Sequence, residues 1–179
     1  MQHVRIPKPS LIFAAALFLG GGPALAQNLP GGASSLNETH GDWTVTCVTL
    51  DGTVRCAVSQ IQINSENRQR VLSVELTAND GGNAAGGTFV LPFGLALDQG
   101  VALSIDEGEP MASLRFSTCL PAGCLVPLTF DQNAITAMRA GAALKAKAAA
   151  NGGGQDVNFS ISLSGFTSAL ARAAELGGS

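Results

Sequence analysis

The chain has 179 residues, of which 46% are hydrophobic and 13% are charged, and its formal net charge at pH 7 is −3. This length suits one domain with a single core behind an export signal, not a two-domain enzyme. The acidic balance excludes the basic surface that binding to nucleic acid or anionic lipid requires.

Residues 1–26 have the composition of a secretory signal peptide. The start is basic, residues 11–19 form an apolar run, and Ala24-Leu25-Ala26 is a small-x-small cleavage site. We expect cleavage after Ala26 and a mature chain that begins at Gln27. The alternative is an uncleaved anchor, but the run has about half of the roughly 20 residues that a bilayer requires. The sequence therefore predicts a protein of the periplasm, or a secreted one, with no membrane span after cleavage.

We expect residues 27–40 to be a flexible leader and residues 41–177 to be one β domain. Asp51-Gly52 predicts a two-residue hairpin turn, which places Cys47 directly opposite Cys56. Counted from the turn, that pair is a non-hydrogen-bonded one, where a cross-strand disulfide fits best. Trp43 is in phase with both cysteines, so we expect it in the core.

Later segments continue the two-residue alternation of strands. Strands are expected at residues 70–77, 89–97, 101–105, 113–119 and 157–163, and the Gly-rich stretch Asn79–Gly87 is expected to be a loop. Many short strands with frequent turns predict a mainly β fold, an antiparallel β-sandwich or barrel-like domain.

Two short helices interrupt this pattern. Asp131 is placed to cap a helix that ends at Gly141. A second helix is expected from about Phe166 to Leu176, capped near Ser164 or Thr167, with Phe166 and Leu170 in one apolar stripe. We interpret that stripe as structural core packed on the sheet; the alternative is a helix that binds a partner.

The second pair of cysteines lies in the segment Cys119-Leu120-Pro121-Ala122-Gly123-Cys124. Four cysteines allow three connectivities, and Pro and Gly in so short a loop favour the local pair Cys119–Cys124. A thiol redox site is the alternative, but the spacing differs from that of thioredoxin-like motifs. Zinc binding is less favoured, because an oxidising compartment would oxidise the thiols. We therefore expect two structural disulfides.

No catalytic residues, metal ligands or cofactor are predicted. His40 is the histidine that remains after signal cleavage, and we place it in the leader. The acidic group Asp106, Glu107 and Glu109 is interpreted as a solvated turn rather than a calcium site. Lys145 and Lys147 alternate with apolar residues as on the wet face of a strand.

The ordered motifs together resemble the invasion-associated locus B family of exported bacterial proteins. The resemblance covers nearly all of the mature chain and rests on Gly41-Asp42-Trp43, the cysteines at 47 and 56, Leu91–Leu97 with Gly100, Cys119–Cys124, and Ser164-Gly165-Phe166 with Ala169-Leu170. It implies an exported β-sandwich, and the family is named for a member that helps an intracellular pathogen enter host red cells. It supplies no catalytic residues. Residues 78–87 and 140–150 depart from the family pattern.

From these features we predict a non-enzymatic interaction protein that docks on another envelope or membrane protein, through a loop such as Ala78–Gly87 or an exposed sheet edge. The first alternative is a secreted or surface factor that acts in virulence or adhesion and contacts host cells. The second is a module that binds a small ligand between the sheets.

Overall fold

The computed structural model describes residues 29–111 and 113–178. The expected signal peptide, including Ala24 and Ala26, lies outside these residues. The strands are β1 (Ser35–His40), β2 (Trp43–Leu50), β3 (Thr53–Ile63), β4 (Arg70–Asn79), β5 (Ala84–Leu91), β6 (Val101–Ile105), β7 (Thr118–Leu120), β8 (Gly123–Phe130), β9 (Ala143–Ala149) and β10 (Asp156–Ser162). The helices are α1 (Gln132–Ala140) and α2 (Phe166–Gly177), with 3-10 turns at Pro30–Gly32 and Asp80–Gly82.

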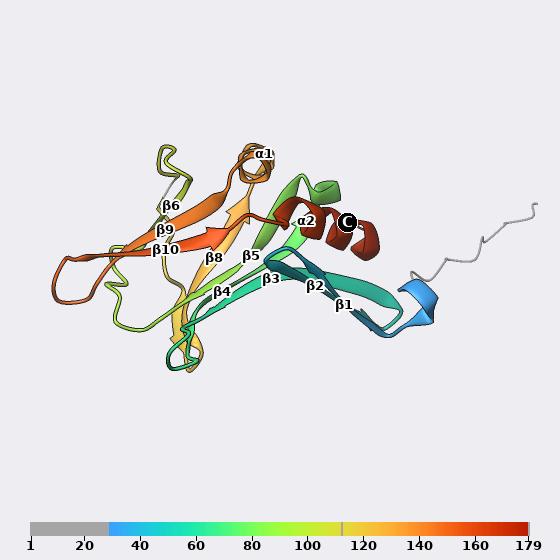
Figure 1. Cartoon of the computed structure of the whole chain (residues 1–179), viewed down its shortest axis with the longest axis horizontal. Helices are drawn as coiled ribbons and strands as arrows, with labels where there is room; N and C mark the ends of the chain where they lie inside the picture. Colours follow the sequence, from blue (N-terminus) through green and yellow to red (C-terminus); the bar gives the residue numbers. More distant parts are fainter. Residues whose placement is uncertain (1–28, 112, 179) are drawn as a thin grey trace, which may run out of the picture.

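The strands form two antiparallel sheets. The large sheet has seven strands in the order β1-β2-β3-β4-β5-β8-β7, and the small sheet has the order β10-β9-β6. The small sheet and α2 lie on the same side of the large sheet (Figure 1), and one hydrophobic core joins all three. The expected fold class, an antiparallel β-sandwich or barrel-like domain with two short helices and two disulfides, is confirmed.

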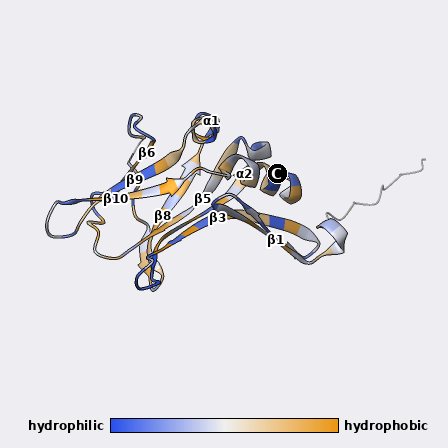
Figure 2. Ribbon diagram, viewed as in Figure 1, coloured by the Kyte–Doolittle hydropathy of each residue, from blue (hydrophilic) through white to orange (hydrophobic). Residues whose placement is uncertain are grey.

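Side-chain alternation decides which face of the large sheet is buried. Along β2, β3 and β4, alternate side chains are buried, and the residues between them are partly or fully exposed. Figure 2 shows hydrophobic and hydrophilic residues mixed along single strands rather than separated into different elements. The face of the large sheet that points away from α2 and the small sheet is covered by no other described element, and we call it the outer face.

Two expectations about loops are wrong. Residues 35–40 are not a flexible leader, because they form β1 and pair with β2 in register from Ser35–Val48 to His40–Trp43. The partly buried side chains of this strand are Leu36, Glu38 and His40, and only the first is apolar, so the strand lacks an apolar alternation. The stretch Asn79–Gly87 is not one loop either, since Ala84–Gly87 belong to β5. A Cβ on Gly87 would lie 2.0 Å from the Glu75 carbonyl oxygen, so the glycine permits close strand pairing.

Two expected strands are shorter than predicted. The apolar segment 89–97 leaves the sheet after Leu91, and the chain then crosses to β6 in the other sheet. Its later apolar residues Leu95 and Ala96 are buried without forming a ladder. Of the segment 113–119, only its end joins β7, although Leu114 makes an isolated bridge to Val101.

The helices lie where the sequence predicts them. The Asp131 side chain accepts a hydrogen bond from the Ala134 N–H at the start of α1, and Gly141 ends that helix. The α2 helix starts after Gly165, which occupies the N-cap position in place of Ser164 or Thr167. In the described part of the chain, no helix is both long and apolar enough to cross a membrane.

Candidate functional site

The four cysteines form two cross-strand disulfides. Cys47 is bonded to Cys56 across β2 and β3, with a Cα–Cα distance of 4.1 Å, and Cys119 is bonded to Cys124 across β7 and β8. The first pair has the register expected from the Asp51-Gly52 turn. Each bridge fixes a hairpin of the large sheet, and the described residues contain no free thiol.

Trp43 is the centre of the contact between the sheets and α2. Its side chain is fully buried, its ring lies 5.2 Å from that of Phe166, and its Nε1 donates a hydrogen bond to the Ser162 carbonyl at 2.9 Å. Phe166 and Leu170 are also fully buried. These three residues therefore have structural positions in which no ligand reaches them.

The β1–β2 turn, Gly41-Asp42, packs directly on the turn that precedes α2. The Asp42 N–H donates to the Ser164 carbonyl at 3.1 Å. Gly165 has φ of +84°, and a Cβ there would lie 1.9 Å from the His40 carbonyl oxygen. The distant motifs Gly41-Asp42-Trp43 and Ser164-Gly165-Phe166 therefore meet at one contact.

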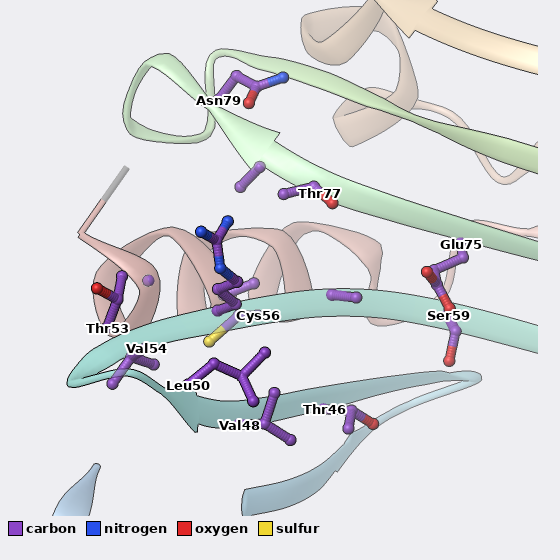
Figure 3. A pocket seen from close by; sticks show the side chains of 15 residues that line it. Thr46, Val48, Leu50, Thr53, Val54, Cys56, Ser59, Glu75, Thr77 and Asn79 are labelled. Atoms are coloured by element: carbon purple, nitrogen blue, oxygen red, sulfur yellow. The ribbon is translucent and has the colours of Figure 1, made fainter. Parts of the chain in front are cut away.

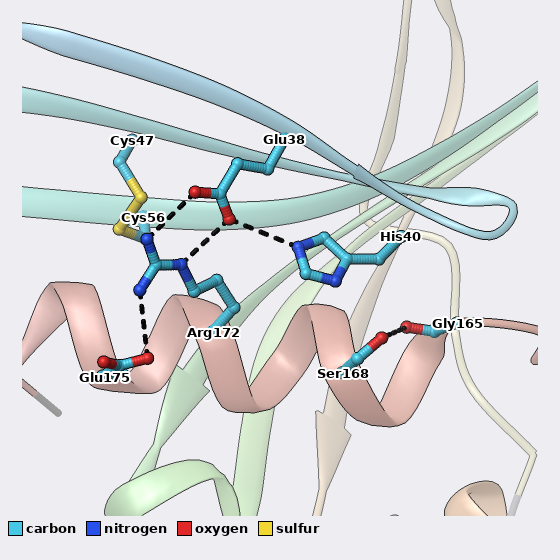
Figure 4. A network of polar contacts seen from close by, with 8 residues as sticks. All are labelled: Glu38, His40, Cys47, Cys56, Gly165, Ser168, Arg172 and Glu175. Atoms are coloured by element: carbon cyan, nitrogen blue, oxygen red, sulfur yellow. Dashed lines mark hydrogen bonds and ion pairs between the residues drawn. A yellow bond between two sulfur atoms is a disulfide. The ribbon is translucent and has the colours of Figure 1, made fainter. Parts of the chain in front are cut away.

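His40 belongs to an ion-pair network that joins β1 to α2 (Figure 4). The Arg172 guanidinium donates two hydrogen bonds to the Glu38 carboxylate at 2.9 and 3.0 Å, and His40 Nε2 lies 3.3 Å from the same carboxylate. The Arg172 hydrogen bonds hold the pKa of Glu38 below its usual value, and they raise the pKa of Arg172. Arg172 also contacts Glu175 at 3.1 Å.

This network does not form a nucleophile and base pair. The neighbouring Ser168 hydroxyl donates to the Gly165 carbonyl at 3.0 Å instead of contacting the His40 imidazole. Acyl transfer requires a hydroxyl or thiol within hydrogen-bond reach of the base. The geometry is that of a clamp between an edge strand and a helix.

Four of the five charged groups singled out in the sequence make surface contacts, and the fifth, Glu109, is exposed. The Asp106 carboxylate accepts hydrogen bonds from the backbone N–H groups of Ala142 and Ala143. Lys145 pairs with Glu107, and Lys147 pairs with Asp156 at 2.8 Å, on the exposed side of β9. Within the described residues, no group of three or more His, Cys, Asp or Glu side chains is placed to hold a metal ion.

The expected docking loop at residues 78–87 is reduced to a tight turn. Gly82 is buried, and its carbonyl accepts a hydrogen bond from Arg139 Nη2 at 2.7 Å. A Cβ on Gly82 would lie 3.5 Å from the Ala174 Cβ of α2. The turn is therefore packed against both helices and does not project as a free loop.

The outer face of the large sheet carries a row of apolar side chains that Ser73 interrupts. Ile61 on β3 pairs with Ser73, which pairs with Val90 on β5, which in turn pairs with Leu125 on β8. Ile61 is 58% exposed and Ile63, at the end of the same strand, is 56% exposed. Both apolar side chains and the partly exposed Val90 and Leu125 lie on the uncovered side.

The same face opens into a cleft between β3 and β4, with a volume of about 600 Å³. Figure 3 shows the two strands diverging toward Thr53 and Asn79, with Ser59 and Glu75 at the narrow end. Ala173 and Gly177 of α2 contribute to the lining. This cleft is not predictable from the sequence, because no local pattern tells where two paired strands separate.

Comparison with known proteins gives a consistent set of relatives. The family described as invasion associated locus B (IalB) protein matches residues 43–174. An invasion protein B homolog of Brucella abortus (strain 2308) is 44% identical over 149 residues, covering 83% of this chain and 85% of the relative. Invasion protein B of Bartonella bacilliformis is 35% identical over 156 residues, covering 86% of this chain and 82% of that protein.

A solved structure agrees with these relatives. The crystal structure of invasion associated protein B from Bartonella henselae matches with a TM-score of 0.74 and 33% identity, over 79% of this chain and 97% of that one. The names of these proteins describe invasion proteins and no enzymatic activity. This chain belongs to the invasion associated locus B (IalB) protein family.

Proposed function

We propose that the protein is an exported, non-enzymatic interaction protein that docks on another protein of the bacterial envelope through the outer face of its large sheet. The observation that carries the proposal is the uncovered apolar row that begins at Ile61. Antiparallel sheets often leave one face to solvent, and that face is then normally polar. Exposed apolar side chains that form a contiguous patch are typical of interaction sites.

The charge on this face supports a protein partner. Along β2, β3, β4, β5 and β8, the outer face carries Arg55 and Glu75 as charged side chains, with Arg70 opposite Ile63 at its end, among Thr, Ser, Val and Ile residues. Protein interfaces have centres depleted in charge and surrounded by a polar rim. The surface therefore has the composition of a docking face rather than of a nucleic-acid site.

Export is supported by the sequence of residues 1–26 and by the disulfides. Two disulfides with no free thiol in the described residues suit an oxidising compartment such as the periplasm. The partner is then an envelope or membrane-embedded protein that meets this domain outside the cytoplasm.

The proposal is tested by affinity recovery from solubilised native envelopes. Ile61→Lys places a charge in the apolar row and should sharply reduce recovery of a stoichiometric partner, while the thermal midpoint stays nearly unchanged because the side chain is exposed. Leu97→Lys, at a residue that is exposed outside the sheet, is the matched control and should recover the partner normally. His40→Ala should also recover it. Equal loss in the Ile61 and Leu97 variants, or a substrate turnover that requires His40, would overturn the proposal.

A second candidate function comes from the names of the relatives. Those names describe invasion proteins in Brucella and Bartonella, and a shared role would place the same sheet face against a component of the host-cell surface. Protease treatment of intact bacteria separates the two candidates. Digestion of the protein on intact cells favours contact with a host, and complete protection favours docking inside the envelope.

A further inference from the structure

The cleft in the large sheet is bounded by two strand edges that lack a neighbour. The pairing of β3 with β4 runs from Ile63–Arg70 to Val58–Leu76 and stops there. Beyond that point, residues 53–57 of β3 pair with β2 alone, and residues 77–79 of β4 pair with β5 alone. The two edges face each other across the cleft (Figure 3).

The register tells which peptide groups point into the cleft. The Cα–Cα distance of 4.1 Å identifies Cys47–Cys56 as a non-hydrogen-bonded pair, so the N–H and C=O groups of Cys56 point away from β2. Those of Val54 and Val58 do the same, since this direction repeats every two residues. Val58 uses its groups to bond Leu76, and the groups of Ala78, two residues further along β4, therefore point toward β3 and into the cleft.

These peptide groups belong to residues with buried side chains. Val54 is 2% exposed, Cys56 is 8% exposed and Ala78 is 3% exposed. No other strand of the described chain pairs with them on the cleft side. Backbone donors and acceptors that are withdrawn from bulk water are nearly always hydrogen-bonded, because an unpaired group loses its bonds to water without replacement. The cleft thus presents two partly shielded edges that a single extended chain would satisfy together.

The side chains around the cleft indicate which kind of segment fits into it. Small residues, Ala173 and Gly177, lie on the α2 side and leave room for an apolar side chain. Arg55 lines the wide end and Glu75 the narrow end, and neither forms an ion pair with another described residue. The two positions are four residues apart along the sheet, because Glu75 pairs with Ser59.

We propose that the cleft is a slot for strand insertion, in which an extended segment of the partner protein pairs with β3 on one side and β4 on the other. The inward side chains of the segment are apolar and face α2. One of its outward side chains is acidic and lies beside Arg55. A basic residue four positions away, roughly 13 Å along an extended chain, lies beyond the slot, where the segment passes over the paired strands near Glu75. This inference rests on the proposed docking function and assigns its site.

The slot suits a short extended segment. Residues 53–57 form one wall, so about five residues of the segment lie inside the slot and span roughly 17 Å, and the residue near Glu75 lies just outside it. No strand of the described chain lies in the slot, and Arg55 and Glu75 form no ion pair with described residues, so we assign the segment to another chain. Recognition by strand addition gains its affinity from main-chain hydrogen bonds and its selectivity from alternate side chains.

The test uses a phage-displayed library of random octapeptides, selected on the purified exported protein. The expected consensus alternates apolar and polar residues, with an acidic and a basic residue four positions apart. A synthetic consensus peptide should slow amide hydrogen exchange at Val54, Cys56 and Ala78. Arg55→Glu should weaken its binding about fivefold or more, whereas Arg115→Glu, the same charge change on the segment between β6 and β7, should not.

A second variant guards against a local folding defect at Arg55. Thr77→Trp fills the opening from an exposed position on β4 and should abolish peptide binding while the thermal midpoint stays within the error of the wild type. Failure to enrich any consensus, or protection confined to β1 or to the small sheet, would overturn the slot. If envelope recovery of a partner survives in Thr77→Trp and is still lost in Ile61→Lys, the slot is wrong while docking on the outer face stands.

Discussion

The contact between Gly165 and the β1–β2 turn predicts that Gly165→Ala strongly destabilises the fold. The residue has φ of +84°, and its Cβ would lie 1.9 Å from the His40 carbonyl oxygen. Real Cβ contacts are not shorter than 3.0 Å, so the two turns must separate by about 1 Å. Separation breaks the hydrogen bond from Asp42 to Ser164 and disturbs the Trp43–Phe166 packing behind it.

The magnitude is the sum of three costs. A left-handed conformation costs an alanine about 1–2 kcal/mol, loss of one backbone hydrogen bond costs about 1 kcal/mol, and forced displacement of packed groups costs about 1–3 kcal/mol. We expect Gly165→Ala to lower the free energy of unfolding by about 3–6 kcal/mol, a large part of the 5–15 kcal/mol that is typical of a domain.

Gly152→Ala is the matched control. Gly152 has φ of +81° in the β9–β10 turn, and a Cβ there meets nothing within 4 Å. It should therefore incur only the conformational cost of about 1–2 kcal/mol. Urea unfolding followed by the fluorescence of Trp43, the single tryptophan, measures both variants. A loss of stability in Gly165→Ala no larger than that in Gly152→Ala would contradict the close contact between Gly165 and the β1–β2 turn.

Three further predictions concern the core, a disulfide and the clamp. Trp43→Ala should lower the free energy of unfolding by about 3–5 kcal/mol through the cavity that it leaves. The Ser162 carbonyl still accepts a hydrogen bond from Gln60 in this variant. A red-shifted, freely quenched Trp43 emission in the wild type would show that the ring is not in the core. Replacing Cys119 and Cys124 with Ser should cost about 2–3 kcal/mol, and non-reducing peptide maps should contain no peptide that links this pair to the other one. Glu38 has a lowered pKa in the fold, so its bond to Arg172 stabilises the protein above the ordinary carboxyl value near 4.5 and loses this effect as pH falls. Glu38→Gln should reduce the fall of the thermal midpoint as the pH is lowered. A variant with the same pH profile as the wild type would contradict this role of Glu38.

Local sequence signals were sufficient where a turn or cap fixes the geometry. The Asp51-Gly52 turn sets the register that brings Cys47 and Cys56 together, and Asp131 and Gly141 bound α1. In each case the residues that specify the turn or helix end lie in the same short segment as the structure that they determine. The confirmed fold class follows from many such segments.

Features that depend on distant residues are not predicted from the sequence. Strand β1 has few apolar residues, and it is held by pairing with β2 and by the bond of Glu38 to Arg172, 134 residues away. Gly86 and Gly87 look like a loop in the sequence but lie in β5, where a side chain at 87 would strike Glu75. The cleft depends on where β3 and β4 diverge over α2, which no single segment encodes.

Site-specific photo-crosslinking in intact bacteria tests the docking site most directly. A photoreactive side chain at position 77, beside the cleft, should form a covalent adduct with a discrete envelope protein, and the joined partner peptide should lie in an extended segment. The same probe at Ser160, on the exposed side of the small sheet, should give none. Adducts of equal yield at both positions, or none at position 77, would contradict the proposal that the outer face of the large sheet is where this protein binds its partner.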